Sequence, residues 1–352
     1  MPQKNTTSRE RILTTLAHNE PDRVPFFLPV SLHGAKELGI SLPEYFASAK
    51  NIVEAQLRLR AKYRHDCVTT YFYAALEHEA WGGDVTYFED GPPNAGMPVI
   101  NKPEDIKRLT SPKVNNTACL KKVLAATEML KEKVTDAPVV GVVLSPFSLP
   151  VMQMGFDKYI ELMYEQPELF WHLMRLNEEF CVDWANAQLA AGADMIVYFD
   201  PVSSSTITQK DLYLKTGCLI AKRTLFQISG LVAMHMASGR CLPILNEIVV
   251  SGAKVVVTSI LEDLAAIKAV CKKKLTVMGN LNTIEMHRWT PLQAEAAVKD
   301  AIFKAGAGGG YILSDNQSEI PVQTPEEVLL AISEAVFKWG RYPLDWVKDY
   351  GR

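Results

Sequence analysis

Short apolar runs alternate with amphipathic segments along almost the whole chain. Eight of these runs read as strands, because most are rich in Val, Ile or Leu and are apolar at consecutive positions. Such continuous runs are typical of a parallel sheet that is covered on both faces. The predicted strands are Val24–Val30, Cys67–Ala74, Pro138–Leu144, Met195–Phe199, Leu231–Met236, Lys254–Ser259, Leu275–Gly279 and Tyr311–Ser314.

Helical patterns fill the stretches between these strands, and several begin with a recognisable cap. Thr7 and Glu10 predict a capping box, in which both side chains bind backbone N–H groups at the start of a helix. Thr290 and Thr324 repeat the device, each followed by a proline at the first helical position. The longest helical stretch is predicted over Phe156–Tyr164 and Pro167–Ala190.

Eight strands alternating with helices predict an α/β fold, the (β/α)8 TIM barrel. The alternative is an open, doubly wound sheet. The glycines at 306 and 308–310 precede a strand, whereas a dinucleotide-binding fingerprint follows one, so the barrel is favoured. We expect a single barrel domain over residues 1–352, with an N-terminal helical extension and a hairpin excursion near 82–100, where Gly, Pro and Asn interrupt β-prone pieces.

Composition narrows the class of protein. The chain has 352 residues with 48% hydrophobic and 22% charged residues and a net charge of -3, which argues against a general nucleic-acid binder. No apolar run approaches the length of a membrane span, and the N-terminal residues lack the apolar core of a signal peptide. Six scattered cysteines without a CxxC pair favour reduced thiols in a cytoplasmic protein. A homodimer is compatible with the sequence, which leaves the oligomeric state open.

Polar side chains collect where the predicted strands end. In a TIM barrel the working groups lie at these carboxyl ends, and the opposite ends here are mostly Ala, Gly, Pro or Lys. The polar set comprises His33, Glu77, His78, Glu79, Ser145, Asp200, His235, Ser259, Asn280, Asn282, Asp315, Asn316 and Gln317.

His235 and Asp200 are the leading catalytic candidates. In a regular strand His235 shares a face with Leu231, Ala233 and Ala237, and the small neighbours on that face leave room beside the imidazole. The alternative for His235 is a core histidine bonded to a backbone carbonyl. Asp200 ends an apolar strand, where a carboxylate accepts a proton, holds a metal or fixes a substrate hydroxyl; its alternative is to cap the Asp-Pro turn that follows.

A third candidate, Glu77, has the same parity as Tyr71 and Tyr73 in and after the second strand. A face that mixes phenol hydroxyls with a carboxylate is typical of a pocket, although an ordinary aromatic core is the alternative. Phe147 and Met152 would complete an apolar, partly aromatic wall. Asn280 and Asn282 follow the seventh strand and are expected to bind substrate, with simple turn chemistry as their alternative.

Several motifs resemble the uroporphyrinogen decarboxylase superfamily, and together they extend from about residue 8 to 338. The resemblance implies a distorted (β/α)8 barrel with one deep pocket. The motifs are Arg9-Glu10-Arg11-Ile12-Leu13, Asp22-Arg23-Val24-Pro25, Glu79-Ala80-Trp81-Gly82, Asp200-Pro201, Gly279-Asn280-Leu281-Asn282 and Thr324-Pro325-Glu326-Glu327-Val328.

Two branches of this superfamily fit the sequence poorly. The decarboxylases carry an arginine-rich segment after the first strand that grips the carboxylates of the tetrapyrrole, but here Leu28–Lys36 contains no arginine. The cobalamin-dependent thiol methyltransferases use a zinc ion held by a His-x-Cys pair and a distant Cys. Here His235 matches the histidine, but Ala237 replaces the first cysteine, and Leu313–Gln317 offers no sulfur.

The remaining branch removes a methyl group from a methylated compound, often a methyl ether, and passes it to the Co(I) corrinoid of a separate protein. The resemblance then implies that His235, Asp200 and Glu77 supply an acid or a metal to the leaving oxygen. Tyr71, Tyr73, Phe147 and Met152 would hold an aromatic or apolar body. A zinc ion on His235 with Glu77 or Asp200 is chemically reasonable, and Cys241 is a further ligand candidate whose alternative is a buried thiol. A non-catalytic barrel that binds a corrinoid or tetrapyrrole for a partner is the hypothesis from another class.

Overall fold

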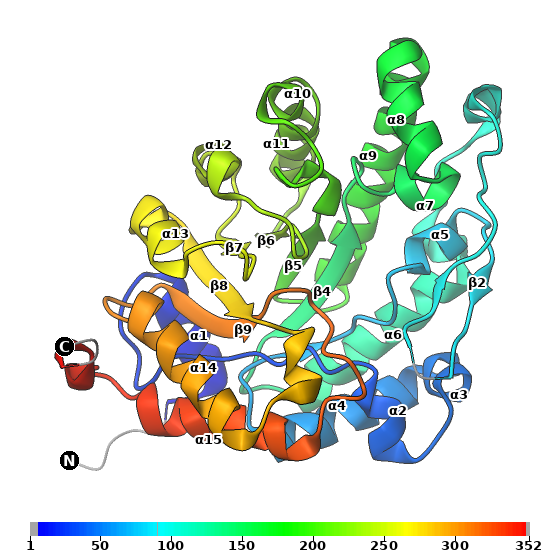
Figure 1. The fold of residues 1–352 in the computed structure, drawn as a ribbon. Helices are drawn as coiled ribbons and strands as arrows, with labels where there is room; N and C mark the ends of the chain where they lie inside the picture. Colours follow the sequence, from blue (N-terminus) through cyan, green and yellow to red (C-terminus); the bar gives the residue numbers. More distant parts are fainter. Residues whose placement is uncertain (1–5, 90, 350–352) are drawn as a thin grey trace.

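The computed structural model describes residues 6–89 and 91–349, so the ends of the expected 1–352 domain and one residue of its 82–100 excursion lie outside the described residues. The main sheet has seven parallel strands in the order β1-β4-β5-β6-β7-β8-β9. It curls into a distorted barrel of the predicted type (Figure 1). Its strands are β1 (Val68–Thr69), β4 (Val139–Leu144), β5 (Met195–Phe199), β6 (Leu231–His235), β7 (Val255–Val257), β8 (Thr276–Leu281) and β9 (Tyr311–Asp315).

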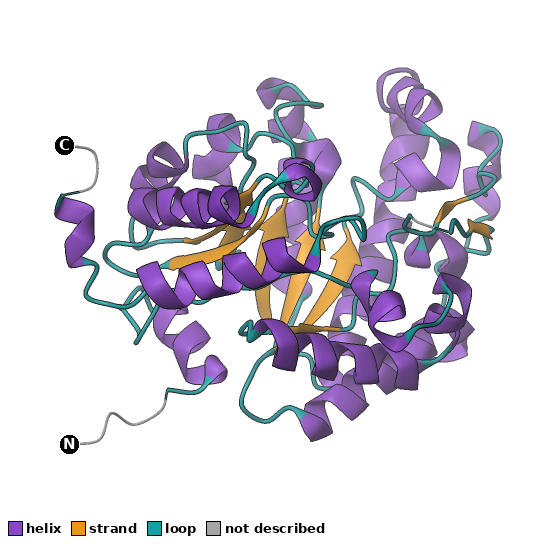
Figure 2. Ribbon diagram, turned by 60° about the horizontal axis from the view of Figure 1, so that its bottom comes forward, coloured by secondary structure: helices purple, strands orange, loops and turns teal. Residues whose placement is uncertain are grey.

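Helices surround the sheet, which lies at the centre of the molecule (Figure 2). The α-helices are α1 (Ser8–Leu16), α2 (His33–Leu38), α3 (Leu42–Ala47), α4 (Ala49–Tyr63), α5 (Leu76–Ala80), α6 (Ala118–Lys133), α7 (Pro150–Met154), α8 (Phe156–Glu165), α9 (Pro167–Ala190), α10 (Lys210–Lys215), α11 (Gly217–Gln227), α12 (Leu245–Val249), α13 (Leu264–Cys271), α14 (Pro291–Ala305) and α15 (Glu326–Trp339). A separate antiparallel pair, β2 (Val85–Thr86) and β3 (Asn94–Ala95), lies in the segment between α5 and α6.

The first predicted strand, Val24–Val30, is extended but makes only one sheet bridge, between Phe26 and Leu313 of β9. Pro25 and Pro29 interrupt the ladder because proline has no backbone N–H group to donate. The segment still closes the barrel, since the Phe27 N–H group donates to Leu313 at 3.0 Å and the Asp66 N–H group donates to Phe26 at 2.8 Å.

The second predicted strand, Cys67–Ala74, is much longer than the observed β1. The chain leaves the sheet after Thr69, whose hydroxyl accepts the Tyr71 N–H group at 3.0 Å in place of a neighbouring strand. Residues from Tyr71 onward therefore lie above the strand end.

Two of the three predicted helix caps are confirmed. Capping boxes join Thr7 with Glu10 and Thr290 with Gln293. The third prediction was wrong: α15 begins after Pro325, and the Thr324 hydroxyl makes no hydrogen bond. The proline at the N-cap position moves the threonine one residue too far from the first free N–H groups of the helix.

Apolar side chains fill the amino-terminal end of the barrel. Ile12 of α1 packs there against buried side chains from the strands, including Val140, Met195 and Val255. Space for a ligand is therefore left toward the carboxyl ends of the strands, as expected for this fold. Within the described residues, no helix has both the length and the apolar character that crossing a membrane requires.

Candidate functional site

A cavity of about 240 Å³ lies toward the carboxyl ends of the strands. Its walls combine aromatic and aliphatic side chains with three carboxyl groups, and no described residue that lines it is Arg or Lys. The strand register places one layer of inward side chains side by side, namely Leu144, Phe199, His235, Val257 and Met278. The other lining residues used below are Ser31, Tyr71, Tyr73, Glu77, Trp184, Gln188, Asp315, Gln317, Ser318 and Glu319.

His235 is the only polar member of that layer. Its ring is 2% exposed and packs edge-on against Phe199, with ring centroids 5.1 Å apart. Nδ1 accepts the Ala237 N–H group at 2.8 Å, whereas Nε2 has no hydrogen-bond partner. Burial lowers the pKa of His235 to about 3, so the ring is neutral at physiological pH.

The predicted candidate Glu77 lies in α5 and lines the cavity. Its Oε1 accepts the Leu144 N–H group at 3.1 Å, which ties the carboxyl group to the end of β4. Burial raises the pKa of Glu77 to about 7 despite this hydrogen bond. The Glu77 carboxyl group can therefore hold a proton near neutral pH.

Two further acids come from the end of β9 and the loop after it. Oδ2 of Asp315 accepts the Thr283 hydroxyl at 2.8 Å and the N–H groups of Gln317 and Ser318 at 2.8 and 2.9 Å. Burial still raises the pKa of Asp315 to about 6. Glu319 accepts the Leu32 N–H group at 3.0 Å, and burial raises its pKa to about 8, so this carboxyl group is mainly protonated at pH 7.

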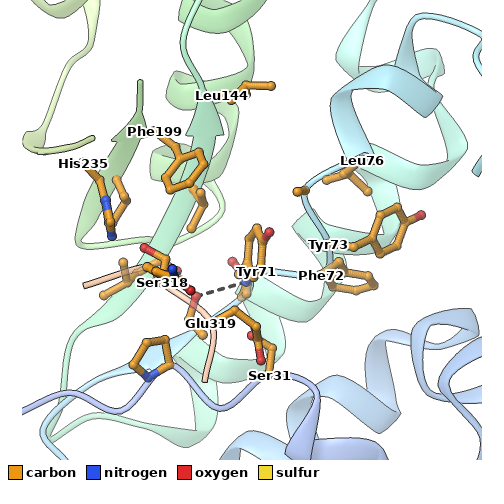
Figure 3. A pocket seen from close by; sticks show the side chains of 18 of the residues that line it. Ser31, Tyr71, Phe72, Tyr73, Leu76, Leu144, Phe199, His235, Ser318 and Glu319 are labelled. Atoms are coloured by element: carbon orange, nitrogen blue, oxygen red, sulfur yellow. Dashed lines mark hydrogen bonds between the residues drawn. The ribbon is translucent and has the colours of Figure 1, made fainter. Parts of the chain in front are cut away.

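The two predicted tyrosines take different orientations. The Tyr71 hydroxyl makes no hydrogen bond with another described residue, and Tyr71 and Glu319 lie across the cavity from Phe199 and His235 (Figure 3). The Tyr73 hydroxyl donates to Glu79 and points away from the cavity in the same view, so Tyr73 contributes its ring to the wall.

The structure thus brings four of the sequence-predicted site residues together: His235, Glu77, Tyr71 and Tyr73. It places Asp200 next to the cavity wall but not in it. Oδ1 of Asp200 accepts the hydroxyls of Ser145 and Ser148 at 2.6 and 2.7 Å, and the side chain is fully buried. This arrangement is closer to the turn-capping alternative than to a group that meets substrate.

Four other predicted side chains, and the thiol candidate, lie outside this cavity. Phe147 belongs to an apolar cluster between helices, and Met152 in α7 packs against the main core. Asn280 and Asn282 line a separate depression of about 140 Å³. Cys241 is fully buried, and its backbone N–H group donates to Glu262 at 2.9 Å. The direction of each side chain depends on the turn that follows its strand, which the strand pattern does not specify.

Glu319 is the acidic residue of the cavity that the sequence motifs and strand ends did not indicate. The predicted polar set ends at Gln317, two residues earlier in the same loop. A set that extends along each loop to the next helix includes Glu319. Trp184 and Gln188 of α9 also reach the cavity, and no motif marked them.

The donor set does not fit a zinc ion. Among the described residues, no group of three or more His, Cys, Asp and Glu side chains is arranged to hold a metal. Zinc sites in proteins use three or four such ligands. Of the proposed zinc ligands, His235 and Glu77 reach the cavity, while Asp200 and Cys241 do not.

A family model described as uroporphyrinogen decarboxylase (URO-D) matches residues 7–339. The chain belongs to the URO-D family. This assignment confirms the resemblance that the motifs indicated, and it covers nearly all of the described chain.

Some of the similar proteins are named uroporphyrinogen decarboxylases and others are named methyltransferases. A uroporphyrinogen decarboxylase from Methylococcus capsulatus is 24% identical over 298 residues, covering 81% of this chain and 83% of the relative. The methylcobamide:CoM methyltransferase MtaA from Methanosarcina barkeri is 24% identical over 163 residues, covering 46% of this chain and 48% of the relative. A solved structure of a methyltransferase from Methanosarcina mazei superposes with a TM-score of 0.85 at 20% identity, covering 95% of this chain and 99% of that one. The last similarity establishes the fold.

Proposed function

We propose that this protein moves a methyl group from a small O-methylated compound, with an aromatic methyl ether as the favoured form, to the corrinoid cofactor of a partner protein. One observation carries the proposal. The cavity combines aromatic walls with Glu77, Asp315 and Glu319, and no described residue that lines it is Arg or Lys. Such a site suits an uncharged ligand whose oxygen needs a proton.

The same observation argues against decarboxylation of a tetrapyrrole, although many relatives carry that name. A substrate with many carboxylates needs fixed cations, and paired guanidinium groups supply much of its binding. Here it would instead meet three acidic side chains. Arg11 and Arg23 of the family motifs bind Asp66 at 2.7 and 2.8 Å, near α1, and do not line the cavity.

Methyl transfer is supported by two of the similar proteins, whose names describe methyltransferases. The thiol-methylating alternative depends on zinc, and the donor set described above does not fit that ion. We therefore assign no step to a metal. The corrinoid on the partner would supply a nucleophilic cobalt centre that accepts the methyl group.

The residues of this chain then serve the leaving oxygen. When the bond between carbon and oxygen breaks, its electron pair stays on oxygen, which is a poor leaving group unless it gains a proton. Glu77 and Glu319 have pKa values raised to about 7 and about 8, so both can hold that proton near neutral pH. Transfer of the proton yields a neutral phenol or alcohol and leaves a carboxylate. Phe199, Leu144 and Val257 keep water from the reacting atoms.

The proposal is tested with cob(I)alamin, free or on a corrinoid protein, and 2-methoxyphenol carrying a deuterated methyl group. We expect methylcobalamin by absorbance and labelled methyl on cobalt by mass spectrometry. Glu319→Gln should be slow, whereas Glu165→Gln, which changes an exposed glutamate on α8, should match the unmodified protein. Formation of coproporphyrinogen from uroporphyrinogen, or no methylation of cobalt with any uncharged methyl ether, would overturn the proposal.

A further inference from the structure

The contact between His235 and Ala237 determines which ring nitrogen carries the proton. The Ala237 N–H group lies 2.8 Å from Nδ1 of His235. A backbone amide can only donate, so the lone pair of Nδ1 must accept. Turning the ring over would place a C–H group against this N–H group and lose the hydrogen bond.

A neutral imidazole has a single ring proton, which therefore resides on Nε2. This nitrogen has no partner in the protein although the side chain is 2% exposed and lines the cavity. A buried N–H group without an acceptor loses its hydrogen bond to water and gains none in return, which is costly. The orphaned donor thus points to a ligand that supplies the acceptor.

The backbone after β6 is shaped to make this contact. Ala237 has a φ of 49°, in the left-handed region that a non-glycine residue seldom adopts. The chain therefore changes direction directly after the N–H group that contacts Nδ1 of His235. A histidine that binds a metal through Nε2 usually shows the reverse pattern, because its Nδ1–H group donates to a carbonyl or carboxylate. Here Nε2 would have to lose its only proton before it could bind a metal.

The side chains around His235 are apolar, so its Nε2–H group is the hydrogen-bond donor of this layer. Within its layer, Leu144, Phe199, Val257 and Met278 offer only hydrocarbon, aromatic or thioether surface. A ligand oxygen in this layer has one directed partner, Nε2–H. The layer therefore selects where the oxygen of a bound molecule lies.

We infer that His235 is a neutral hydrogen-bond donor that binds an oxygen atom of the methyl donor through Nε2–H, in place of the metal that its counterpart is expected to hold in the zinc-dependent branch. This inference rests on the proposed function for the identity of the ligand. The tautomer and the metal content rest on the structure alone, and they are measured without turnover.

Three measurements on the full-length protein test the inference. The first is ¹⁵N NMR of protein labelled at the histidine ring nitrogens, with the His235 signals identified by their loss in His235→Gln. We expect a protonated Nε2 and an unprotonated Nδ1. The second is zinc analysis after dialysis against a zinc salt, for which we expect no stoichiometric zinc in the unmodified protein or in His235→Gln.

The third measurement is calorimetric binding of 2-methoxyphenol and 1,2-dimethoxybenzene. The amide nitrogen of His235→Gln can replace the Nε2–H donor, so this variant should bind within about threefold of the unmodified protein, whereas His235→Leu should bind about tenfold more weakly. A protonated Nδ1, stoichiometric zinc that His235→Gln loses, or equal binding by His235→Leu would overturn the inference. Binding that depends on His235 without methylation of cobalt would uphold it and overturn the proposed function instead.

Discussion

At the scale of single residues, the same chemical group has different roles in different surroundings. Asp66 is fully buried but meets two guanidinium groups, whereas Glu319 lines a cavity without Arg or Lys and gains only hydrogen bonds. Burial without a cation raises the pKa of Glu319 to about 8. Glu77 and Glu319 can therefore hold a proton near neutral pH, a property that follows from their burial and not from their residue type.

The pH dependence of the reaction follows from these pKa values. The reactive form is the protonated carboxyl group, so kcat/KM should be level at low pH and fall as pH rises through about 8, the raised pKa of Glu319. In Glu319→Gln the rate should fall roughly 100-fold, and the remaining decline should move to about pH 7, the pKa of Glu77. Initial rates of cobalt methylation from pH 5.5 to 9.5 check this; a profile that is unchanged in the variant would contradict it.

The pH dependence of protein stability gives a second test of the raised pKa of Glu319, and it needs no substrate. Its pKa rises from about 4.5 to about 8 on folding, so the folded state holds the proton more tightly. Its contribution to the free energy of unfolding is complete below pH 4.5 and is lost as pH rises through about 8. Glu319→Gln should flatten this decline in urea titrations at pH 5, 7 and 9, and Glu165→Gln should not. Parallel curves for all three proteins would rule the shift out.

Asp200 is expected to support the fold instead of the chemistry. Asp200→Asn keeps the size of the side chain but weakens the hydrogen bonds that Ser145 and Ser148 donate at 2.6 and 2.7 Å. We expect a loss of about 1–3 kcal/mol in the free energy of unfolding and a less than fivefold change in the rate of the folded protein. Glu77→Gln should show the opposite pattern. A large rate loss in Asp200→Asn with unchanged stability would restore the catalytic role predicted from the sequence.

At the scale of elements, two of the sequence motifs explain how the barrel is closed. Asp66 accepts the Arg11 guanidinium at 2.7 Å, the Arg23 guanidinium at 2.8 Å and the Phe26 N–H group at 2.9 Å. These contacts join α1, the proline-interrupted segment that replaces the first strand, and Asp66 itself, two residues before β1. Side-chain ion pairs thus hold this segment in place where ladder hydrogen bonds are missing.

Removal of this carboxylate should be strongly destabilising. Asp66→Ala removes the carboxylate that Arg23, at 5% exposure, pairs with, and leaves Arg11, at 7% exposure, paired with Asp22 alone. Breaking a buried pair in this way typically costs about 3–5 kcal/mol. Urea unfolding followed by circular dichroism measures the loss, with Asp157→Asn on the surface of α8 as the control. A loss below about 1 kcal/mol would show that the proline-containing segment holds its place without Asp66.

At the scale of the whole molecule, the apolar filling around Ile12 leaves the barrel open only toward the strand ends, and the charges within that space have one sign. Acidic groups line the cavity, whereas Arg9, Arg11 and Arg23 are paired with Asp194, Asp22 or Asp66 and do not line it. The distribution of charge therefore selects ligands by their charge as well as by their size.

A matched pair of ligands tests this selection. 2-Methoxyphenol and 4-hydroxy-3-methoxybenzoate share a ring, a hydroxyl and a methoxy group and differ in one carboxylate. We expect the uncharged compound to bind at least about tenfold more tightly, because the carboxylate would be buried without a cation. The preference should widen from pH 6 to pH 9 as Glu77 and Glu319 lose their protons. Calorimetric titration measures both effects, and equal or tighter binding of the carboxylate would contradict the prediction.

The sequence by itself determined the fold class and indicated that Glu77 and His235 lie at the same end of the barrel. Consecutive apolar residues specify buried parallel strands, and the carboxyl ends of such strands converge, so Glu77 and His235 could be placed together from their positions alone.

Tertiary structure decided what no local pattern contains. Glu319 meets Leu32 across 287 residues of chain, and Asp200 turns toward two serines instead of the cavity. The proton of His235 is directed to Nε2 by the hydrogen bond that the Ala237 N–H group donates to Nδ1. Long-range contacts and turn geometry set these features, because hydrogen-bond partners and burial are properties of the folded chain.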